Sequence, residues 1–245
     1  ESVVIHSSAP TVSVLRRVPL LAVIVRSIHV TTRPDIIRHF LLLGVGMRCS
    51  EFRRSESERI LRAQPFIADA SVLAYPADSG DGVEIEVRTI DETSILVGGS
   101  MRSTSPFVTR FLLGNSNLSG NAVYAAAHWG HDATFRDAYG VRLADFQLGG
   151  KPYMATLTAN QQPLGNDWSA EAAHPFLTDL QRVAWRVLGG SSNGLALFEP
   201  VRDQVHGINV LLQYFDAGGI VRIGPPGRLR LFGASISGGR ERAAD

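Results

Sequence analysis

The stretch "GNSNLSGNAVYAAAHW" (residues 114–129) passes from a turn into a strand and marks a change in the character of the sequence. Glycine and asparagine tolerate positive φ, and asparagine side chains close turns on their own backbone, so residues 114–121 predict a turn. Leu118 is the one apolar side chain of this turn, and we expect it to anchor the turn. The apolar run after the turn predicts a strand. From here to the end of the chain, helix signals largely disappear.

Segments in which apolar and polar residues alternate come after this turn. In "PYMATLTANQ" (152–161), Tyr153, Ala155 and Leu157 face one way, whereas Thr156 and Thr158 face the other. Further segments of this kind span 138–148, 167–174, 181–188, 207–215 and 227–235. Such a regular antiparallel meander is typical of both a soluble β-sandwich and a barrel, and the alternation alone does not choose between them.

The preceding part of the chain, residues 22–93, mixes helix and strand signals in the order β-α-α-β-β. Strands are predicted at 24–32, 66–75 and 83–90, and Pro34 predicts the start of the first helix. Ser55 and Glu58 have the spacing of a capping box for the second helix. We expect a small sheet with two helices on one face. Residues 1–21 form an N-terminal lead, and the small-residue segment 94–106 forms a joint to the strand-rich part of the chain.

Composition excludes several classes of protein. Of the 245 residues, 44% are hydrophobic, which suits a packed core or a lipid-facing surface, and the formal charge of +1 gives no electrostatic basis for binding nucleic acid. The longest apolar run, "VPLLAVIV" (18–25), is too short for a membrane helix. Cys49 is the single cysteine, so neither an intrachain disulfide nor a cysteine metal cluster is expected.

Candidate chemical sites are weak. "HWGHD" places His128, His131 and Asp132 together, but strand residues three apart point to opposite faces, so we expect a strand end and no metal site. The glycine-rich loops lack the lysine and the strand-then-helix setting of a phosphate loop, so no cofactor is expected. Because no set of serine, histidine and aspartate has supporting context, we predict that the protein is not an enzyme.

The order of the two halves resembles the BamA/TamA-like outer-membrane assembly factors, the bacterial surface antigen family, in which POTRA domains precede a sixteen-stranded barrel. "IVRSIHVTT" (24–32), "IIRHFLLLGVGMRCS" (36–50) and "GVEIEVRTIDE" (82–92) resemble parts of a POTRA domain. The first barrel hairpin of that family carries a Gly-Asn/Asp-x-Asn-Leu/Phe-x-Gly pattern. The matching residues here are Gly114, Asn115, Asn117, Leu118 and Gly120.

The resemblance implies an α+β POTRA-like module at 22–93, followed at 107–245 by an antiparallel, membrane-type β-barrel portion of about eight strands. Its first strand is expected at about 107–113, followed directly by the hairpin motif. Because eight strands are half of the family's barrel, we favour an N-terminal fragment of a longer protein over a reduced member with a small barrel.

The resemblance also implies a function: the assembly, insertion or translocation of other proteins at the bacterial outer membrane, with the POTRA domain in the periplasm. Client segments would add a strand to an exposed edge of the POTRA sheet, the mode called β-augmentation. The candidate edge residues are Ile24, Arg26, Ile28, Val30, Val72 and Ala74. The implied partners are unfolded outer-membrane proteins, outer-membrane lipids and accessory envelope proteins. Two alternatives stay open: a passive small outer-membrane barrel, and a soluble two-domain enzyme with a β-sandwich.

Overall fold

The structure is a computed structural model, and it describes residues 3–10, 30–77, 82–101, 103, 108–132, 136–201 and 204–244. Contacts divide the chain into two compact units. The first unit comprises Glu1–Leu96, Asn115–Tyr124 and Phe146–Pro152, and the second comprises Val97–Gly114, Ala125–Asp145 and Tyr153–Asp245. Of the helices in the described ranges, none has the length and apolar character needed to cross a membrane.

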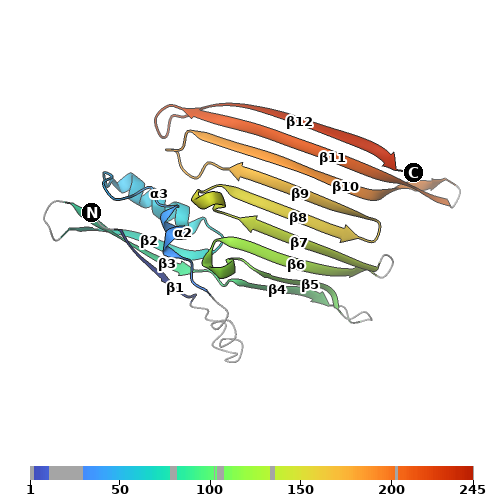
Figure 1. Ribbon diagram of the computed structural model, residues 1–245, viewed down its shortest axis with the longest axis horizontal. Coiled ribbons are helices and arrows are strands. Elements are labelled where there is room, and N and C mark those ends of the chain that lie inside the picture. The colour runs from blue at the N-terminus through green and yellow to red at the C-terminus, as the bar shows by residue number, and fades with distance from the viewer. Residues whose placement is uncertain are drawn as a thin grey trace. The chain divides into compact units, whose positions relative to one another are not determined.

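In the described residues, the first unit contains a three-stranded sheet and two α-helices (Figure 1). Its elements are β1 (Val3–Ser8), α2 (Pro34–Arg38), α3 (Glu51–Arg62), β2 (Ile67–Pro76) and β3 (Val83–Asp91). The strand order is β1-β3-β2, with β1 parallel and β2 antiparallel to β3. Strand β1 lies in the segment expected to be a lead. Most of the strand expected at 24–32 lies outside the described residues, and Val30–Thr32 are not in a strand.

Apolar side chains of the helices and of the sheet form the core of this unit. Ile37, Leu61, Phe66, Val72 and Val87 are fully buried. Helix α3 begins earlier than the sequence suggests, because the Ser50 hydroxyl caps it by accepting a hydrogen bond from the backbone N–H of Arg53. The expected capping box at Ser55 and Glu58 is therefore wrong, since both residues lie inside the helix.

The second sheet has nine strands in the order of the chain, from β4 at one edge to β12 at the other (Figure 1). The strands are β4 (Ile95–Met101), β5 (Val108–Asn115), β6 (Val123–Asp132), β7 (Arg136–Asp145), β8 (Met154–Gln162), β9 (Gly165–His174), β10 (Val183–Val201), β11 (Gln204–Ile223) and β12 (Arg230–Ala244). Strands β7 to β12 pair antiparallel. In the described part of the chain the sheet is open, because β4 and β12 each pair with one neighbour.

The sheet begins one strand earlier than expected. Strand β4 occupies part of the segment 94–106, whose glycines and serines read as a joint. At Gly99 a side chain would approach the carbonyl oxygen of Arg110 to 3.1 Å, so this glycine permits close pairing of the two strands. "GNSNLSGN" consequently connects β5 to β6 and is the second connection of the sheet, not the first.

Candidate functional site

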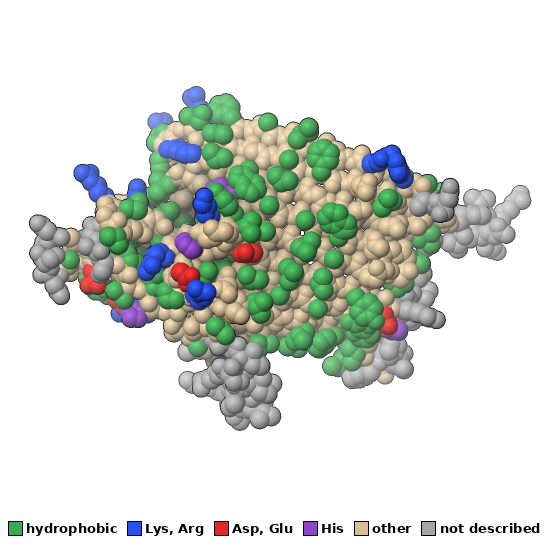
Figure 2. Space-filling model, viewed as in Figure 1, with side chains coloured by type: hydrophobic (Ala, Val, Ile, Leu, Met, Phe, Trp, Pro, Cys, Tyr) green, Lys and Arg blue, Asp and Glu red, His purple; other side chains and the backbone are tan. Residues whose placement is uncertain are grey.

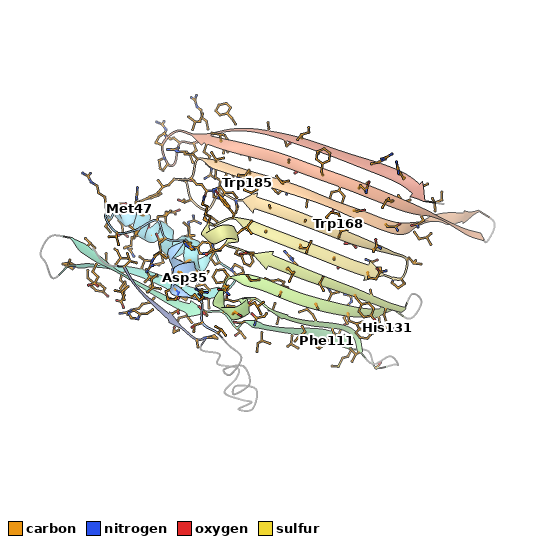
Figure 3. The ribbon with its side chains drawn as sticks, in the orientation of Figure 1. Asp35, Met47, Phe111, His131, Trp168 and Trp185 are labelled. Carbon is orange, nitrogen blue, oxygen red and sulfur yellow. The ribbon has the colours of Figure 1, made fainter. Side chains whose placement is uncertain are left out.

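One face of the nine-stranded sheet is apolar across six strands. Side chains alternate along each strand, and the strand registers place a set of apolar residues on the same side. This apolar face comprises Tyr139, Val141, Leu143, Leu157, Ala159, Trp168, Ala170, Ala172, Trp185, Val187, Phe215, Ala217, Val221, Phe232, Ala234 and Ile236. Figure 2 shows hydrophobic side chains spread over the strands of this sheet on the face toward the viewer. Figure 3 labels two aromatic residues of the apolar face, Trp168 on β9 and Trp185 on β10.

The apolar face is exposed. Val141 is 46% accessible, Phe215 51% and Ile236 65%, so the described residues leave this face largely uncovered. Contiguous apolar patches of more than a few hundred Å² are rare on soluble monomers, because each Å² left in water forgoes roughly 25 cal/mol. The face therefore requires an apolar medium or an apolar partner.

The opposite face is mainly polar, although it also carries Leu188, Leu212 and Ile220. It carries, among others, Arg142, Thr156, Thr158, Asn160, Asp167, Ser169, Glu171, Arg186, Ser192, Tyr214 and Asp216. Two of its contacts cross between strands: Asn160 Nδ2 donates to Asp167 Oδ2 at 2.7 Å, and the Arg186 guanidinium lies 3.0 Å from Asp216 Oδ1. Pairing of this kind is typical of side chains that meet water on one face of a sheet.

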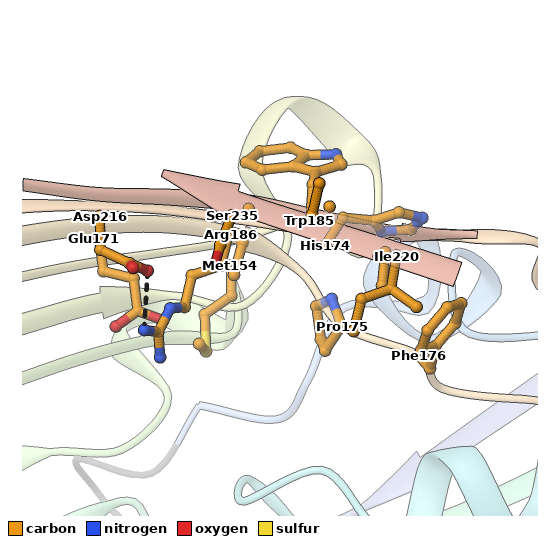
Figure 4. A pocket seen from close by; sticks show the side chains of 16 residues that line it. Met154, Glu171, His174, Pro175, Phe176, Trp185, Arg186, Asp216, Ile220 and Ser235 are labelled. Atoms are coloured by element: carbon orange, nitrogen blue, oxygen red, sulfur yellow. Dashed lines mark hydrogen bonds and ion pairs between the residues drawn. The ribbon is translucent and has the colours of Figure 1, made fainter. Parts of the chain in front are cut away.

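A hollow of about 590 Å³ lies among β8 to β12 (Figure 4). Met154, Glu171, Arg186 and Asp216 contribute to its lining from the polar face, and Phe176 contributes from the β9–β10 connection. The guanidinium of Arg222 lies 3.6 Å from the centre of the Phe176 ring, an arginine–aromatic contact that holds this connection. The lining also includes Trp185 and Ala234 of the apolar face, and its described residues form no recognisable catalytic set.

His128 and His131, two of the three candidate metal ligands, have separate contacts in the sheet, and the side chain of Asp132 lies outside the described residues. His131 Nδ1 lies 2.6 Å from Asp137 Oδ1 across the β6–β7 hairpin. The ring of His128 occupies the place where a side chain at Gly140 would lie. The described residues hold no cluster of three or more histidine, cysteine, aspartate or glutamate side chains arranged for a metal.

The predicted turn motif lies mainly in the first unit and contacts the segment around α2. Asn117 is 1% exposed, donates from Nδ2 to Thr32 Oγ1 at 2.7 Å, and accepts the N–H of Ala122 at 2.8 Å. Gly120 has φ of +70°, and its carbonyl accepts the N–H of Arg33 at 3.1 Å. A side chain at Gly120 would collide with the carbonyl of Thr31, so the contact requires glycine.

The other motif residues have smaller roles. Gly114 and Asn115 end β5, and Asn115 Oδ1 accepts the N–H of Asn117 at 2.8 Å, as in an Asx turn. Leu118 is 46% exposed, so the expectation that it anchors the turn is wrong. The buried amide of Asn117 is the anchor, because its Nδ2 donates to Thr32 and its Oδ1 accepts from Ala122.

A second turn, between β7 and β8, lies where "QLGGK" (147–151) predicts a separator between two strands, but its likeness to the first turn was not predicted. In "FQLGG" (146–150), Gln147 takes the place of Asn117, and it is 5% exposed. Its Nε2 donates to the carbonyl of Ile36 at 2.5 Å, and its Oε1 accepts from His39 Nδ1 at 2.9 Å. The Phe146 ring packs on Phe66 with centroids 6.0 Å apart. The shared pattern Asn/Gln-Leu-x-Gly was the signal available in the sequence.

The two turns together hold opposite ends of one short segment. The first turn binds Thr32 and Arg33, before α2, and the second binds Ile36 and His39, at its end. Helix α2 has five residues, too few to be stable by itself. We call this arrangement, made by Asn117, Gly120 and Gln147, the turn clamp.

The predicted client edge is described only in part. Ile24, Arg26 and Ile28 lie outside the described residues, and Val30 is exposed and outside any strand. Val72 and Ala74 lie on β2, which is an edge strand of the three-stranded sheet. Val72 is buried and Ala74 is exposed.

Comparison with known proteins finds similarity among solved structures. No family model and no curated protein sequence matches the chain. Among solved structures, the chain is similar to the crystal structure of BamA from Haemophilus ducreyi lacking POTRA domains 1-3, with a TM-score of 0.48 and 10% sequence identity. The match covers 97% of this chain and 48% of that chain, so the chain spans about half the length of that structure.

Proposed function

We propose that the chain is part of an outer-membrane β-barrel protein that assembles, inserts or translocates other proteins. The first unit would be a POTRA-like domain in the periplasm, and the nine-stranded sheet would be a portion of the barrel wall. The observation that carries this proposal is the exposed apolar face, which lies opposite a mainly polar face on five of its six strands.

This pair of faces favours a membrane over a soluble sandwich. A sandwich buries its apolar face against a second sheet, whereas a membrane barrel turns it to lipid and keeps its polar face inside. Strands β6, β7 and β9 each have 10 residues. A tilted strand of about 9–11 residues crosses the hydrocarbon core of a bilayer. The same observation disfavours the soluble enzyme.

An aromatic cluster at one end of the apolar face also fits a membrane. The Tyr153 ring contacts His174 and Trp185, with centroids 4.7 and 5.7 Å apart. Tyrosine and tryptophan gather where a barrel wall meets the lipid headgroups, because their rings combine an apolar body with a polar group.

The assembly role is supported by the module that precedes the sheet. The first unit has the order β-α-α-β-β, which resembles the order expected for a POTRA domain. Its strand β2 lies at an edge of the described three-stranded sheet, where an extended client could add by β-augmentation. The proposed work is therefore binding and positioning, without bond-breaking chemistry or a cofactor. Unfolded outer-membrane proteins, lipids and accessory envelope proteins are the proposed partners.

Reconstitution of the full chain tests this function. We expect the chain to require detergent or lipid, to migrate differently on gels before and after heating, and to crosslink to an unfolded outer-membrane protein through a photoreactive residue at Ala74. A chain that is monomeric and soluble without detergent would contradict the membrane assignment. Insertion into vesicles with ion conductance and without crosslinks would instead indicate a passive barrel.

A further inference from the structure

The outer edge of β2 is partly occupied by side chains of α3. Among the described strands, β2 pairs with β3 alone. On its other side, the backbone N–H of Val72 donates to Glu58 Oε2 at 3.1 Å, and its carbonyl accepts from the Arg54 guanidinium at 2.6 Å. These are the two backbone groups that an added strand would use at Val72.

The two side chains belong to a ladder of alternating charge. Arg54, Glu58 and Arg62 are spaced four residues apart on α3, so they share one face of the helix. The nitrogen–oxygen distances along the ladder are 3.6 Å from Arg54 to Glu58, 3.0 Å from Glu58 to Arg62 and 2.8 Å from Arg62 to Asp69. Asp69 Oδ1 in turn accepts the N–H of Ala70 at 2.9 Å. We call Arg54, Glu58, Arg62 and Asp69 the edge lock.

The two lock residues that contact Val72 are partly shielded from water. The Arg54 and Glu58 side chains are 25% and 23% exposed, whereas Arg62 and Asp69 are about half exposed at 49% and 58%. Hydrogen bonds from charged groups to backbone are stronger than neutral ones, and partial burial reduces their screening by salt. An incoming strand must therefore displace two favourable contacts before it pairs at Val72.

The described residues leave the remainder of the edge uncovered. Ala74 and Tyr75 are exposed, and Val72 is the last residue of β2 whose backbone contacts the lock. Charged side chains over a sheet edge are a known means by which proteins prevent unwanted strand pairing. Here they cover one half of the strand and leave the other half accessible.

We propose that the edge lock is an autoinhibitory contact that controls client pairing at β2. This inference rests on the proposed function, because it needs clients that bind by β-augmentation. Pairing begins at Ala74 and extends toward Ala70 as the client replaces the lock. A client carbonyl takes the place of Glu58 at the Val72 N–H, and a client N–H takes the place of Arg54 at the Val72 carbonyl.

Two variants of the full chain test the lock. The lock variant is Arg54→Met with Glu58→Ala, and the control is Glu56→Ala with Arg59→Met, which removes another ion pair of the same helix, 2.9 Å long. Both leave the net charge unchanged. The probe is a fluorescent synthetic peptide copying β7 (residues 136–145), with a version carrying Val141→Pro as a negative probe, since proline cannot donate to a ladder.

We expect the lock variant to bind the peptide at least about tenfold more tightly than the wild type or the control variant does. None of the three proteins should bind the proline peptide. Hydrogen exchange at Ala70 and Val72 without peptide is the second readout, and it should accelerate in the lock variant only. If the double variant does not fold, the single change Arg54→Met should show a smaller effect in the same direction.

The two readouts separate failure of the lock from failure of the proposed function. Equal peptide affinity in the wild type and the lock variant, or unchanged exchange at Val72, would overturn the lock. Accelerated exchange in the lock variant with no peptide binding by any protein would overturn client pairing at β2 as proposed, and would leave the edge contact itself established.

Discussion

At the scale of single residues, the buried amide of Asn117 matters more than the glycines that make its turn recognisable. It bridges Thr32 of one chain segment and Ala122 of another. The sequence identified the motif by its turn-forming residues, but it assigned the anchoring role to Leu118, which is exposed. Apolar character predicts burial on average, whereas a buried amide is recognisable only when its hydrogen-bond partners are known.

Removing this amide should loosen the turn clamp. Asn117→Ala leaves the Thr32 hydroxyl and the Ala122 N–H without their partner, and we expect a loss of about 1–3 kcal/mol in local stability. Hydrogen exchange of residues 32–40 measures this loss. The matched change Leu118→Ala, in the same turn, should cost less than about 0.5 kcal/mol. Equal effects of the two changes would show that the amide does not anchor the turn.

Acid should weaken the first turn of α3. A hydrogen bond from Arg54 holds the pKa of the Glu51 carboxyl below its ordinary value of 4.5. A lowered pKa in the folded state contributes stability that is complete above the unfolded value and is lost as pH falls through the folded value. We expect amide protection at residues 52–55 to decline below pH 4.5 in the wild type and to be less dependent on pH in Glu51→Gln. Identical pH profiles would contradict this assignment.

At the scale of elements, alternation in the sequence predicted most strands of the second sheet, but it did not predict strand β4 or the contacts at the edge of β2. The eight strands β5 to β12 lie in the segment where about eight were expected, because a period of two survives in each. Strand β4 was missed because Gly98, Gly99 and Ser100 resemble a linker. The edge lock was not predictable, since arginine and glutamate at helical spacing are typical of a solvated helix face.

A charge on the apolar face should be costly, and one on the polar face should not. Leu143→Arg places a guanidinium where we expect lipid, and the cost in a bilayer should be about 2–4 kcal/mol if Leu143 lies near the midplane. Thr156→Arg, on the polar face of the adjacent strand and opposite Glu171, is the control and should change stability by less than about 1 kcal/mol. Urea unfolding in lipid vesicles measures both. A similar cost for the two changes would contradict the assignment of the faces.

At the scale of the whole molecule, each of the two compact units is made of segments that are not consecutive in the sequence. The sequence divided the protein into consecutive domains, but the first unit also takes in residues 115–124 and 146–152. Local patterns cannot reveal this, because the hydrogen bonds of Asn117 and Gln147 join residues 85 and 111 positions apart. The repeated Asn/Gln-Leu-x-Gly spacing is the sequence feature that the two inserted segments share.

The central claim is that the apolar face meets lipid, and spin-label accessibility in vesicles tests it most directly. Cys49 is exposed and is the single cysteine, so Cys49→Ser gives a background for one label at a time. Labels replacing Val141 and Leu157 should be accessible to oxygen and protected from a water-soluble nickel complex, and labels replacing Thr156 and Thr158 should show the reverse. Protection of Val141 and Leu157 from both reagents, or equal access of nickel to all four positions, would contradict the membrane assignment.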